Sequence, residues 1–276
     1  SALVIICIVL SVCGFLFWAS ASIRSGVYLK AFCRERTTGK VVYLTFDDGP
    51  VRGERYAGVL GNMTCTTGVL DVLRKHGART TFFIIGKNIS GNEDIVRQAL
   101  ADGHKIGIHS WGHENLFPLY SASRMTEDIL RCKKTLEALS GEEVRLFRPP
   151  FGVVNPTIAR SVKLLGLQTV GWSIRSFDTM HCNRSDWESR VADRIMRHLH
   201  PGAVILLHSP PPRRSSPPSS TASPPPATAS TARAEIGPVL LRALLMSLWV
   251  MRLHLLPRLD FSPRLDLLPR LHFFEQ

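Results

Sequence analysis

Thr45-Phe46-Asp47-Asp48-Gly49-Pro50 is the stretch around which the rest of the chain is organised. It follows Val41-Val42-Tyr43-Leu44, an apolar run of β-branched and aromatic residues that predicts a buried strand. Gly49-Pro50 then predicts a turn, so two adjacent carboxylates stand at the end of a strand. Neighbouring like charges make it costly for both to ionise unaided. A metal ion would resolve the conflict, because one Asp could coordinate it while the other stays free as a base. A surface turn without chemistry is the alternative.

Further strand and helix patterns alternate downstream of this motif. Apolar runs predict strands over 80–85, 105–108, 144–147, 167–173 and 203–207. Helical periodicity and end signals predict helices over 68–75, 93–102, 126–139, 156–165 and 185–199. Asn92 and Asn155 precede two of these helices as capping residues, and the segment 185–188 has the form of a capping box.

Strict alternation of strand and helix predicts a parallel sheet with right-handed crossovers. In a β/α barrel the carboxyl ends of the strands converge on one face, where catalytic sites are built. The polar residues at or just beyond the predicted strand ends are Asp47, Asp48, His109, Arg148, Asp178 and His208. Although they are scattered in the sequence, they are expected to meet in space.

His109-Ser110-Trp111-Gly112-His113 places two imidazoles four residues apart. On one helical turn they would share a face, as ligands of a divalent metal must. Together with one carboxylate of the Asp pair, they would form a three-ligand site that is open to water and substrate. Such a site suits a catalytic zinc ion better than a structural one. Surface histidines are the alternative reading of this pair.

Together these residues resemble the polysaccharide deacetylases with a NodB-like domain, of the carbohydrate esterase family 4 type. The resemblance covers 41–208 and rests on five blocks in the family's order, 45–49, 109–113, 148–152, 172–178 and 206–208. It implies a distorted, incomplete β/α barrel of about seven β/α units. It also implies removal of acetyl groups from carbohydrates, mostly N-acetylglucosamine units, with a divalent metal. Zn²⁺ is the expected metal, with Co²⁺, Ni²⁺ or Mn²⁺ as alternatives.

The resemblance also assigns roles by position. Asp47 corresponds to the general base that deprotonates the attacking water, and His208 corresponds to the acid that protonates the leaving amine. The metal ligands implied are Asp48, His109 and His113.

Further roles follow for residues around these groups. Arg148 would orient Asp47, and Asp178 would support His208. The backbone N–H of Phe151 would hold the oxyanion, and Trp172 and Leu206 would line the acetyl methyl group. Core packing is the alternative for the last two.

The sequence departs from the family pattern in three places. Phe151 stands where the third block usually has Tyr. In the fourth block, Arg175 and Thr179 replace the usual first Asp and the Trp, which weakens the role expected of Asp178. After His208 a Pro-rich run takes the place of the family's closing β/α segment.

The segment 2–18 is apolar almost throughout and carries no charge. Its length suits a membrane anchor or a long signal segment, and Ala19-Ser20-Ala21 resembles a cleavage site. The basic residues that follow within 24–40 would place that side in the cytoplasm by the positive-inside rule, so the orientation stays open. The net charge of +12 suits anionic envelope polymers or lipid headgroups, with a solvated basic surface as the alternative. The sequence contains no basic run interleaved with aromatic residues, so nucleic acid is not an expected partner.

Composition divides the chain into five parts: a transmembrane anchor or signal segment (1–22), a basic linker (23–40), the deacetylase domain (41–208), a disordered linker rich in Pro, Ser and Thr (209–235) and an apolar, basic tail (236–276). The six cysteines show no C-x-x-C pair and no disulfide framework, and Cys132 is expected in the core.

The sequence therefore predicts a metal-dependent hydrolase of the cell envelope, membrane-anchored or secreted. It would act on peptidoglycan or a chitin-like polymer that contains N-acetylglucosamine. Two alternatives stay open: an inactive membrane-anchored carbohydrate-binding protein, and an esterase for xylan acetyl groups.

Overall fold

The computed structural model describes residues 2–52, 65–180 and 186–209. The predicted tail, the predicted Pro-rich linker beyond Ser209, and Cys182 lie outside the described residues.

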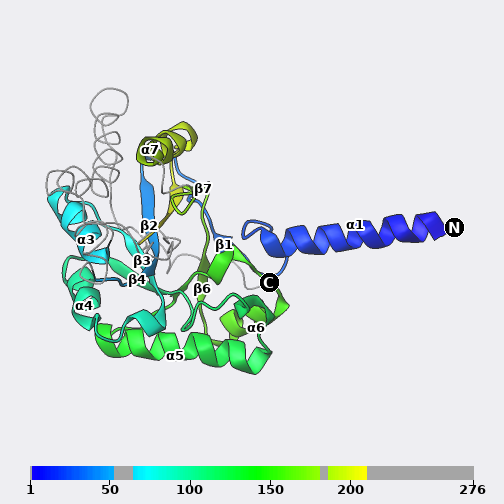
Figure 1. Cartoon of the computed structure of the whole chain (residues 1–276), viewed down its shortest axis with the longest axis horizontal. Helices are drawn as coiled ribbons and strands as arrows, with labels where there is room; N and C mark the ends of the chain where they lie inside the picture. The colour runs from blue at the N-terminus through cyan, green and yellow to red at the C-terminus, as the bar shows by residue number, and fades with distance from the viewer. Residues whose placement is uncertain (1, 53–64, 181–185, 210–276) are drawn as a thin grey trace, which may run out of the picture.

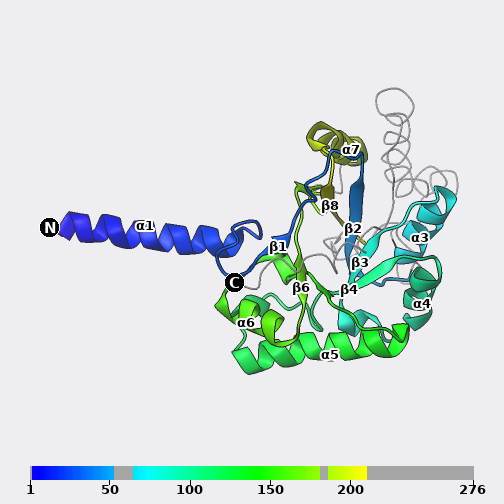
Figure 2. The same ribbon diagram turned by 180° about the vertical axis from the view of Figure 1, so that it is seen from behind.

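Eight parallel strands form a single curled sheet, which Figures 1 and 2 show from opposite sides. Along the chain they are β1 (Ala31–Phe32), β2 (Val42–Gly49), β3 (Thr81–Ile84), β4 (Lys105–Ile108), β5 (Leu146–Phe147), β6 (Gln168–Val170), β7 (Ile174–Arg175) and β8 (Ala203–His208). Their order in the sheet is β1-β6-β5-β4-β3-β2-β8-β7. The parallel sheet predicted from the alternation of strand and helix is confirmed.

One short segment brings the two ends of this sheet together. β6 pairs with β5, whereas β7, four residues later, pairs with β8 on the far side of the sheet. Between them, the Ser173 N–H donates to the Val204 carbonyl at 3.0 Å. The sheet therefore curls into a distorted barrel-like shape, as predicted.

Helices pack on the outside of the curled sheet (Figures 1 and 2). They are α3 (Thr66–Lys75), α4 (Glu93–Ala101), α5 (Ala122–Ser140), α6 (Pro156–Leu164) and α7 (Trp187–His198). Three short 3₁₀ turns, η3 (Gly86–Asn88), η4 (Phe117–Leu119) and η5 (Pro150–Gly152), connect strands to helices.

Side chains alternate along β2 as the two-residue period of a strand requires. Val42, Leu44 and Phe46 join the large apolar core beneath the helices. Tyr43 belongs to a smaller inner cluster with Phe83 on β3. The interior of the barrel is thus filled by side chains, and Cys132 on α5 is fully buried in the outer core, as predicted.

The predicted helix caps agree with the structure in one case and differ in another, and the third falls on a residue that the structure does not describe. The Asn155 side chain accepts from the Ile158 N–H at 2.9 Å and caps α6 as predicted. Asn92 stands at the start of α4, but its side chain does not accept from the helix; its amide donates to the Asn88 carbonyl instead. Helix α7 begins at Trp187 with Asp186 at the cap position, and Ser185, the predicted cap, lies outside the described residues.

Two short strands were not predicted. β7 is only two residues long, and β1 lies inside the segment 23–40 that was expected to be a linker. β1 pairs with β6, and Arg34 forms an isolated bridge with Ala203. Part of this segment therefore belongs to the sheet. Two residues give no periodicity, so the sequence carried no strand signal.

Helix α1 (Ala2–Ala21) projects away from the sheet and its helices (Figure 1). It is the one helix in the described part of the chain that is long and apolar enough to cross a membrane. Among its residues only Ala19 is buried against the rest of the molecule.

Candidate catalytic and metal centre

The paired carboxylates lie at the end of β2, as the motif predicted. Asp47 is buried and lies in register with His208 on the neighbouring β8. Successive side chains of a regular strand point to opposite faces, but Asp48 has a left-handed backbone with φ of 71°. Both carboxylates therefore approach one imidazole: the Nε2 atom of His109 lies 3.8 Å from Asp47 Oδ2 and 3.5 Å from Asp48 Oδ1.

Arg148 holds Asp47 from inside the barrel. Its guanidinium is fully buried and donates to Asp47 Oδ1 at 2.6 Å and to the Thr45 hydroxyl at 2.9 Å. It also donates to the backbone carbonyls of Val170 and Gly171, at 3.1 Å and 2.8 Å. These bonds fix the guanidinium and leave the other oxygen of Asp47 facing the site. The structure thus brings Arg148 to Asp47, as expected.

His109 and His113 reach the site from the loop after β4. The Nδ1 atom of His109 lies 2.7 Å from the Arg148 carbonyl. A carbonyl can only accept, so Nδ1 carries the proton and Nε2 offers its lone pair to the site. The Nε2 atom of His113 lies 3.6 Å from Asp48 Oδ1.

The expectation that the two histidines share one helical turn is wrong. The loop is irregular, and Ser110 and His113 both have left-handed backbones, with φ of 64° and 48°. The imidazoles nevertheless lie side by side, with ring centroids 4.9 Å apart. The loop is therefore shaped by contacts with other elements rather than by a helix.

Asp48, His109 and His113 fit a divalent metal. Their ligand atoms all lie within 4.8 Å of one another. Asp48 Oδ1 is buried and has no hydrogen-bond partner, which is costly unless a cation is bound there. Burial lowers the pKa of His109 and of His113 and so keeps both imidazoles neutral, the form that binds metals. Burial also raises the pKa of Asp48, which a bound cation would reverse. One carboxylate and two imidazoles are a donor set suited to zinc.

His208 is held by Asp178 on the other side of Asp47. Its Nδ1 lies 2.8 Å from Asp178 Oδ1, and its backbone N–H donates to Asp178 Oδ2 at 2.7 Å. Burial alone would lower the pKa of His208. The hydrogen bond and charge of Asp178, with the charges of Asp47 and Asp48, more than offset burial and raise this pKa to about 9. The imidazole is therefore protonated at neutral pH.

Asp178 contacts His208 as expected, although the fourth sequence block departs from the family pattern. The Ser176 hydroxyl donates to its carboxylate at 2.8 Å. The indole N–H of Trp187, at the start of α7, donates to its backbone carbonyl at 2.9 Å. A tryptophan nine residues further along thus contacts Asp178, and nothing in the motif spacing pointed to it.

The three residues expected to line the site are Phe151, Trp172 and Leu206. Phe151 has a left-handed backbone with φ of 62°, and its half-exposed ring lies 4.8 Å from the ring of His113. Trp172 packs against Gly152, where a Cβ would fall 2.3 Å from its indole. Leu206 is buried on β8, where it pairs with Thr45 of β2. These positions are compatible with both a lining role and core packing for Trp172 and Leu206.

Sequence reasoning missed the residues that hold the histidine loop. Asp128 on α5 accepts from the backbone N–H groups of Trp111 and Gly112. Lys87 on η3 donates to the Gly112 carbonyl, and the Ser110 hydroxyl accepts from the His113 N–H. Asp128 sits on a helix that its periodicity located, but no pattern linked it to a loop 16 residues earlier.

Comparison with known proteins finds similarity to one family. A sequence model described as "Polysaccharide deacetylase" matches residues 34–170. A peptidoglycan-N-acetylglucosamine deacetylase of Bacillus cereus is 35% identical over 177 residues, which cover 61% of this chain and 72% of that protein. The peptidoglycan-N-acetylglucosamine deacetylase PgdA of Listeria monocytogenes is 33% identical over 175 residues, 62% of this chain but only 33% of that protein. The chain thus spans about a third of the Listeria protein. Among solved structures, PdaA of Bacillus subtilis, a family 4 carbohydrate esterase, matches with a TM-score of 0.59 and 26% identity over 80% of each chain.

Proposed function

The chain belongs to the polysaccharide deacetylase family, and on that premise we propose that it is a metal-dependent hydrolase that removes N-acetyl groups from a polysaccharide containing N-acetylglucosamine. The observation that carries this proposal is the convergence of three arrangements at one end of the sheet. They are the Asp47–Arg148 pair, the Asp48, His109 and His113 cluster, and the His208–Asp178 pair. The relatives named above are peptidoglycan deacetylases, which favours peptidoglycan as the polymer.

Asp48, His109 and His113 would hold the metal, most suitably Zn²⁺. When bound, the metal supplies a Lewis acid that polarises the acetyl carbonyl and makes water more acidic. The unpartnered Asp48 Oδ1 supports this assignment independently of the family resemblance.

Asp47 would act as the general base. The charge-assisted hydrogen bond from Arg148 fixes the orientation of the carboxylate. Its second oxygen takes the proton from water as the water oxygen attacks the acetyl carbon. We assign the developing oxyanion to the backbone N–H of Phe151. This residue has a left-handed backbone, and its ring lies beside that of His113.

His208 would act as the general acid. The Nδ1 atom of His208 is hydrogen-bonded to Asp178, so Nε2 is the atom that can deliver a proton to the nitrogen of the leaving amine. The C–N bond then breaks, and the products are acetate and the free amino sugar. Trp172 and Leu206 would border the acetyl methyl group.

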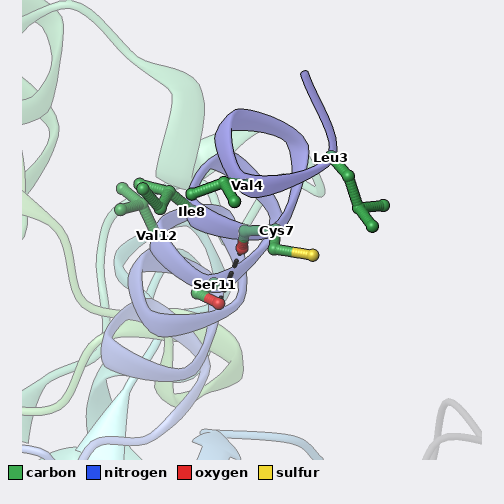
Figure 3. A pocket seen from close by; sticks show the side chains of 6 residues that line it. All are labelled: Leu3, Val4, Cys7, Ile8, Ser11 and Val12. Carbon is green, nitrogen blue, oxygen red and sulfur yellow. Dashed lines mark hydrogen bonds between the residues drawn. The ribbon is translucent and has the colours of Figure 1, made fainter. Parts of the chain in front are cut away.

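We also propose that α1 anchors the protein in a membrane and remains attached. Its exposed surface is apolar, and Figure 3 shows one part of it, where Val4, Ile8 and Val12 stand together and Leu3 points away from them. The Ser11 hydroxyl in this part donates to the Cys7 carbonyl, so it needs no partner outside the helix.

The base of α1 is part of the folded domain, which argues against cleavage there. Ala19 is fully buried, and the Ser20 carbonyl accepts from the Val154 N–H, just after the loop that carries Phe151. Cleavage after Ala21 would remove both contacts. A catalytic domain held on an envelope membrane is the localisation that this junction supports.

Acetate release from a chitopentaose, by the full chain in detergent with added zinc, tests the proposed activity. Asp47→Asn is the matched control, because it keeps the shape of the side chain and removes the base. Release by the parent and not by the variant is expected. A folded, zinc-loaded parent that releases no acetate from this substrate or from peptidoglycan would overturn the proposal, and release from acetylated xylan alone would reassign it as an esterase.

A further inference from the structure

The loop that carries His113 adopts a conformation that its own sequence does not favour. Ser110 and His113 both have positive φ, a region that costs residues with a Cβ about 1–2 kcal/mol each. His109 depends less on this loop, because it directly follows β4 and its Nδ1 is fixed by the Arg148 carbonyl. The position of His113 must therefore be maintained by neighbouring elements.

Asp128 supplies the main polar contact to this loop. Its Oδ1 accepts from the Trp111 N–H at 2.7 Å and its Oδ2 from the Gly112 N–H at 3.2 Å. One carboxylate thus binds the two consecutive amides that precede His113. Hydrogen bonds between a charged carboxylate and backbone amides are stronger than neutral ones, and this carboxylate is partly shielded from water.

Other residues on η3 and α5 also contact this loop. The Lys87 ammonium donates to the Gly112 carbonyl, and the Lys87 backbone N–H donates to the Trp111 carbonyl at 3.0 Å. The Trp111 ring lies over Gly86, where a Cβ would fall 2.3 Å from the indole, and the guanidinium of Arg131 lies 3.8 Å from the ring centroid. Arg131 and Asp128 are three residues apart on α5, so one face of this helix contacts both the ring and the backbone of the loop.

We propose that Asp128 is a positioning residue that sets the metal affinity of the site through His113. The inference rests on the proposed metal site and adds a residue that does not touch the metal. With Asp128 in place, the His113 imidazole is held beside Asp48 before any metal binds, so binding need not order the loop. Without Asp128, the free energy needed to hold Ser110 and His113 in left-handed conformations would reduce the free energy of metal binding.

The test measures the zinc affinity of the full chain in detergent by competition with a chromophoric chelator, without substrate. Asp128→Asn keeps the size of the side chain, but its NH₂ group would face an amide donor. Loss of an interaction that orients a metal ligand weakens metal affinity by roughly 10–100-fold, and we expect an effect of this size although Asp128 acts through the loop and not on the His113 ring. Glu127→Gln is the matched control, because Glu127 is an exposed carboxylate next to Asp128 on the same helix, and it should leave affinity unchanged.

Two further readouts separate positioning from a general loss of structure. The absorption spectrum of the Co²⁺-loaded protein should change in Asp128→Asn, since the His113 ligand is displaced. Asp128→Glu, which restores the carboxylate, should recover part of the affinity. If Asp128→Asn does not fold, Lys87→Met is used in its place. It removes the side-chain donor to the Gly112 carbonyl together with a positive charge near His113, and weaker zinc binding in spite of that lost positive charge is the expected result.

A parent that binds no zinc would contradict the proposed metal site. A parent that binds zinc, beside a folded Asp128→Asn with the same affinity and the same Co²⁺ spectrum, would overturn this inference alone.

Discussion

Asp178 binds His208 twice, through Oδ1 to the imidazole Nδ1 at 2.8 Å and through Oδ2 to the backbone N–H at 2.7 Å. The two contacts fix the position of the ring and direct its Nδ1–H to the carboxylate. They also place a carboxylate against a largely buried imidazole, which is why the charged form of His208 is favoured in spite of burial.

We predict that His208 in the metal-free protein titrates at about 9, and that Asp178→Asn lowers this pKa. Without the carboxylate, burial is left as the larger influence and favours the neutral ring. Histidine NMR titration measures both values. In the zinc-loaded enzyme the positive metal would lower the pKa of His208, so the alkaline limb of kcat/KM should lie below the metal-free value. An alkaline limb that Asp178→Asn does not move would exclude His208 as the acid.

The same pair makes stability depend on pH. The pKa of His208 is raised in the folded state, so its contribution is fully present below the ordinary value of about 6.5 and is lost as pH rises through about 9. The difference in unfolding free energy between the parent and His208→Gln should therefore shrink between pH 7 and pH 10. Urea unfolding at a series of pH values measures it, and a difference independent of pH would contradict the raised pKa.

Arg148 and Asp47 form a buried charge pair, so removing one partner should be far worse than removing both. We predict that Arg148→Met destabilises the protein by roughly 3–5 kcal/mol, because it leaves the Asp47 carboxylate buried without its cation. Asp47→Asn in the Arg148→Met background should recover part of that loss. Urea unfolding of both single variants and the double variant gives the coupling, and strict additivity would contradict it.

Much of this centre was predictable because parallel strands end on one face. Asp47, His109, Arg148 and His208 each follow an apolar run that the sequence shows clearly, and the topology brings those ends together. The alternation of side chains along β2 also follows from the period of a strand, whereas the register that sets Asp47 beside His208 comes from the pairing of β2 with β8.

What escaped prediction depends on contacts between distant residues. The loop between His109 and His113 matched a helical turn by spacing, yet Asp128 and Lys87 hold it in another conformation. Asp48 has a left-handed backbone that turns its carboxylate toward the histidines. Its backbone carbonyl accepts a hydrogen bond from the side-chain amide of Asn88, which is 40 residues away in sequence. Single-sequence patterns report local preference and do not contain such partners.

The unpartnered oxygen of Asp48 leads to a prediction about metal removal. Zinc at about 100 times its dissociation constant should stabilise the parent by ~2.7 kcal/mol, or roughly 5–10 °C in melting temperature. Asp48→Ala should lose this shift, because it removes one ligand of three. A chelator should abolish acetate release by the parent, and added zinc should restore it. If zinc raised the melting temperature of Asp48→Ala as much as that of the parent, the metal would have to bind elsewhere.

Gly152 and Gly166 offer a matched pair that isolates the contact with Trp172. Both have left-handed backbones, with φ of 69° and 63°, so an alanine at either position costs about 1–2 kcal/mol of backbone strain. They differ in what a Cβ would meet: nothing lies within 4 Å at Gly166, whereas the Trp172 indole lies at 2.3 Å at Gly152. Gly152→Ala must also displace that ring, and overpacking of this kind costs about 1–3 kcal/mol more.

We therefore predict that Gly152→Ala lowers the free energy of unfolding, measured with urea, by more than Gly166→Ala does. We also predict that of the two variants only Gly152→Ala loses acetate release at saturating zinc. The second effect is expected because Gly152 adjoins Phe151, whose backbone N–H we assign to the oxyanion, and because Trp172 would border the acetyl group. Equal stability losses would show that Trp172 moves aside freely. A larger loss of stability in Gly152→Ala with full activity would leave Trp172 as a packing residue, since its displacement would then not affect the reaction.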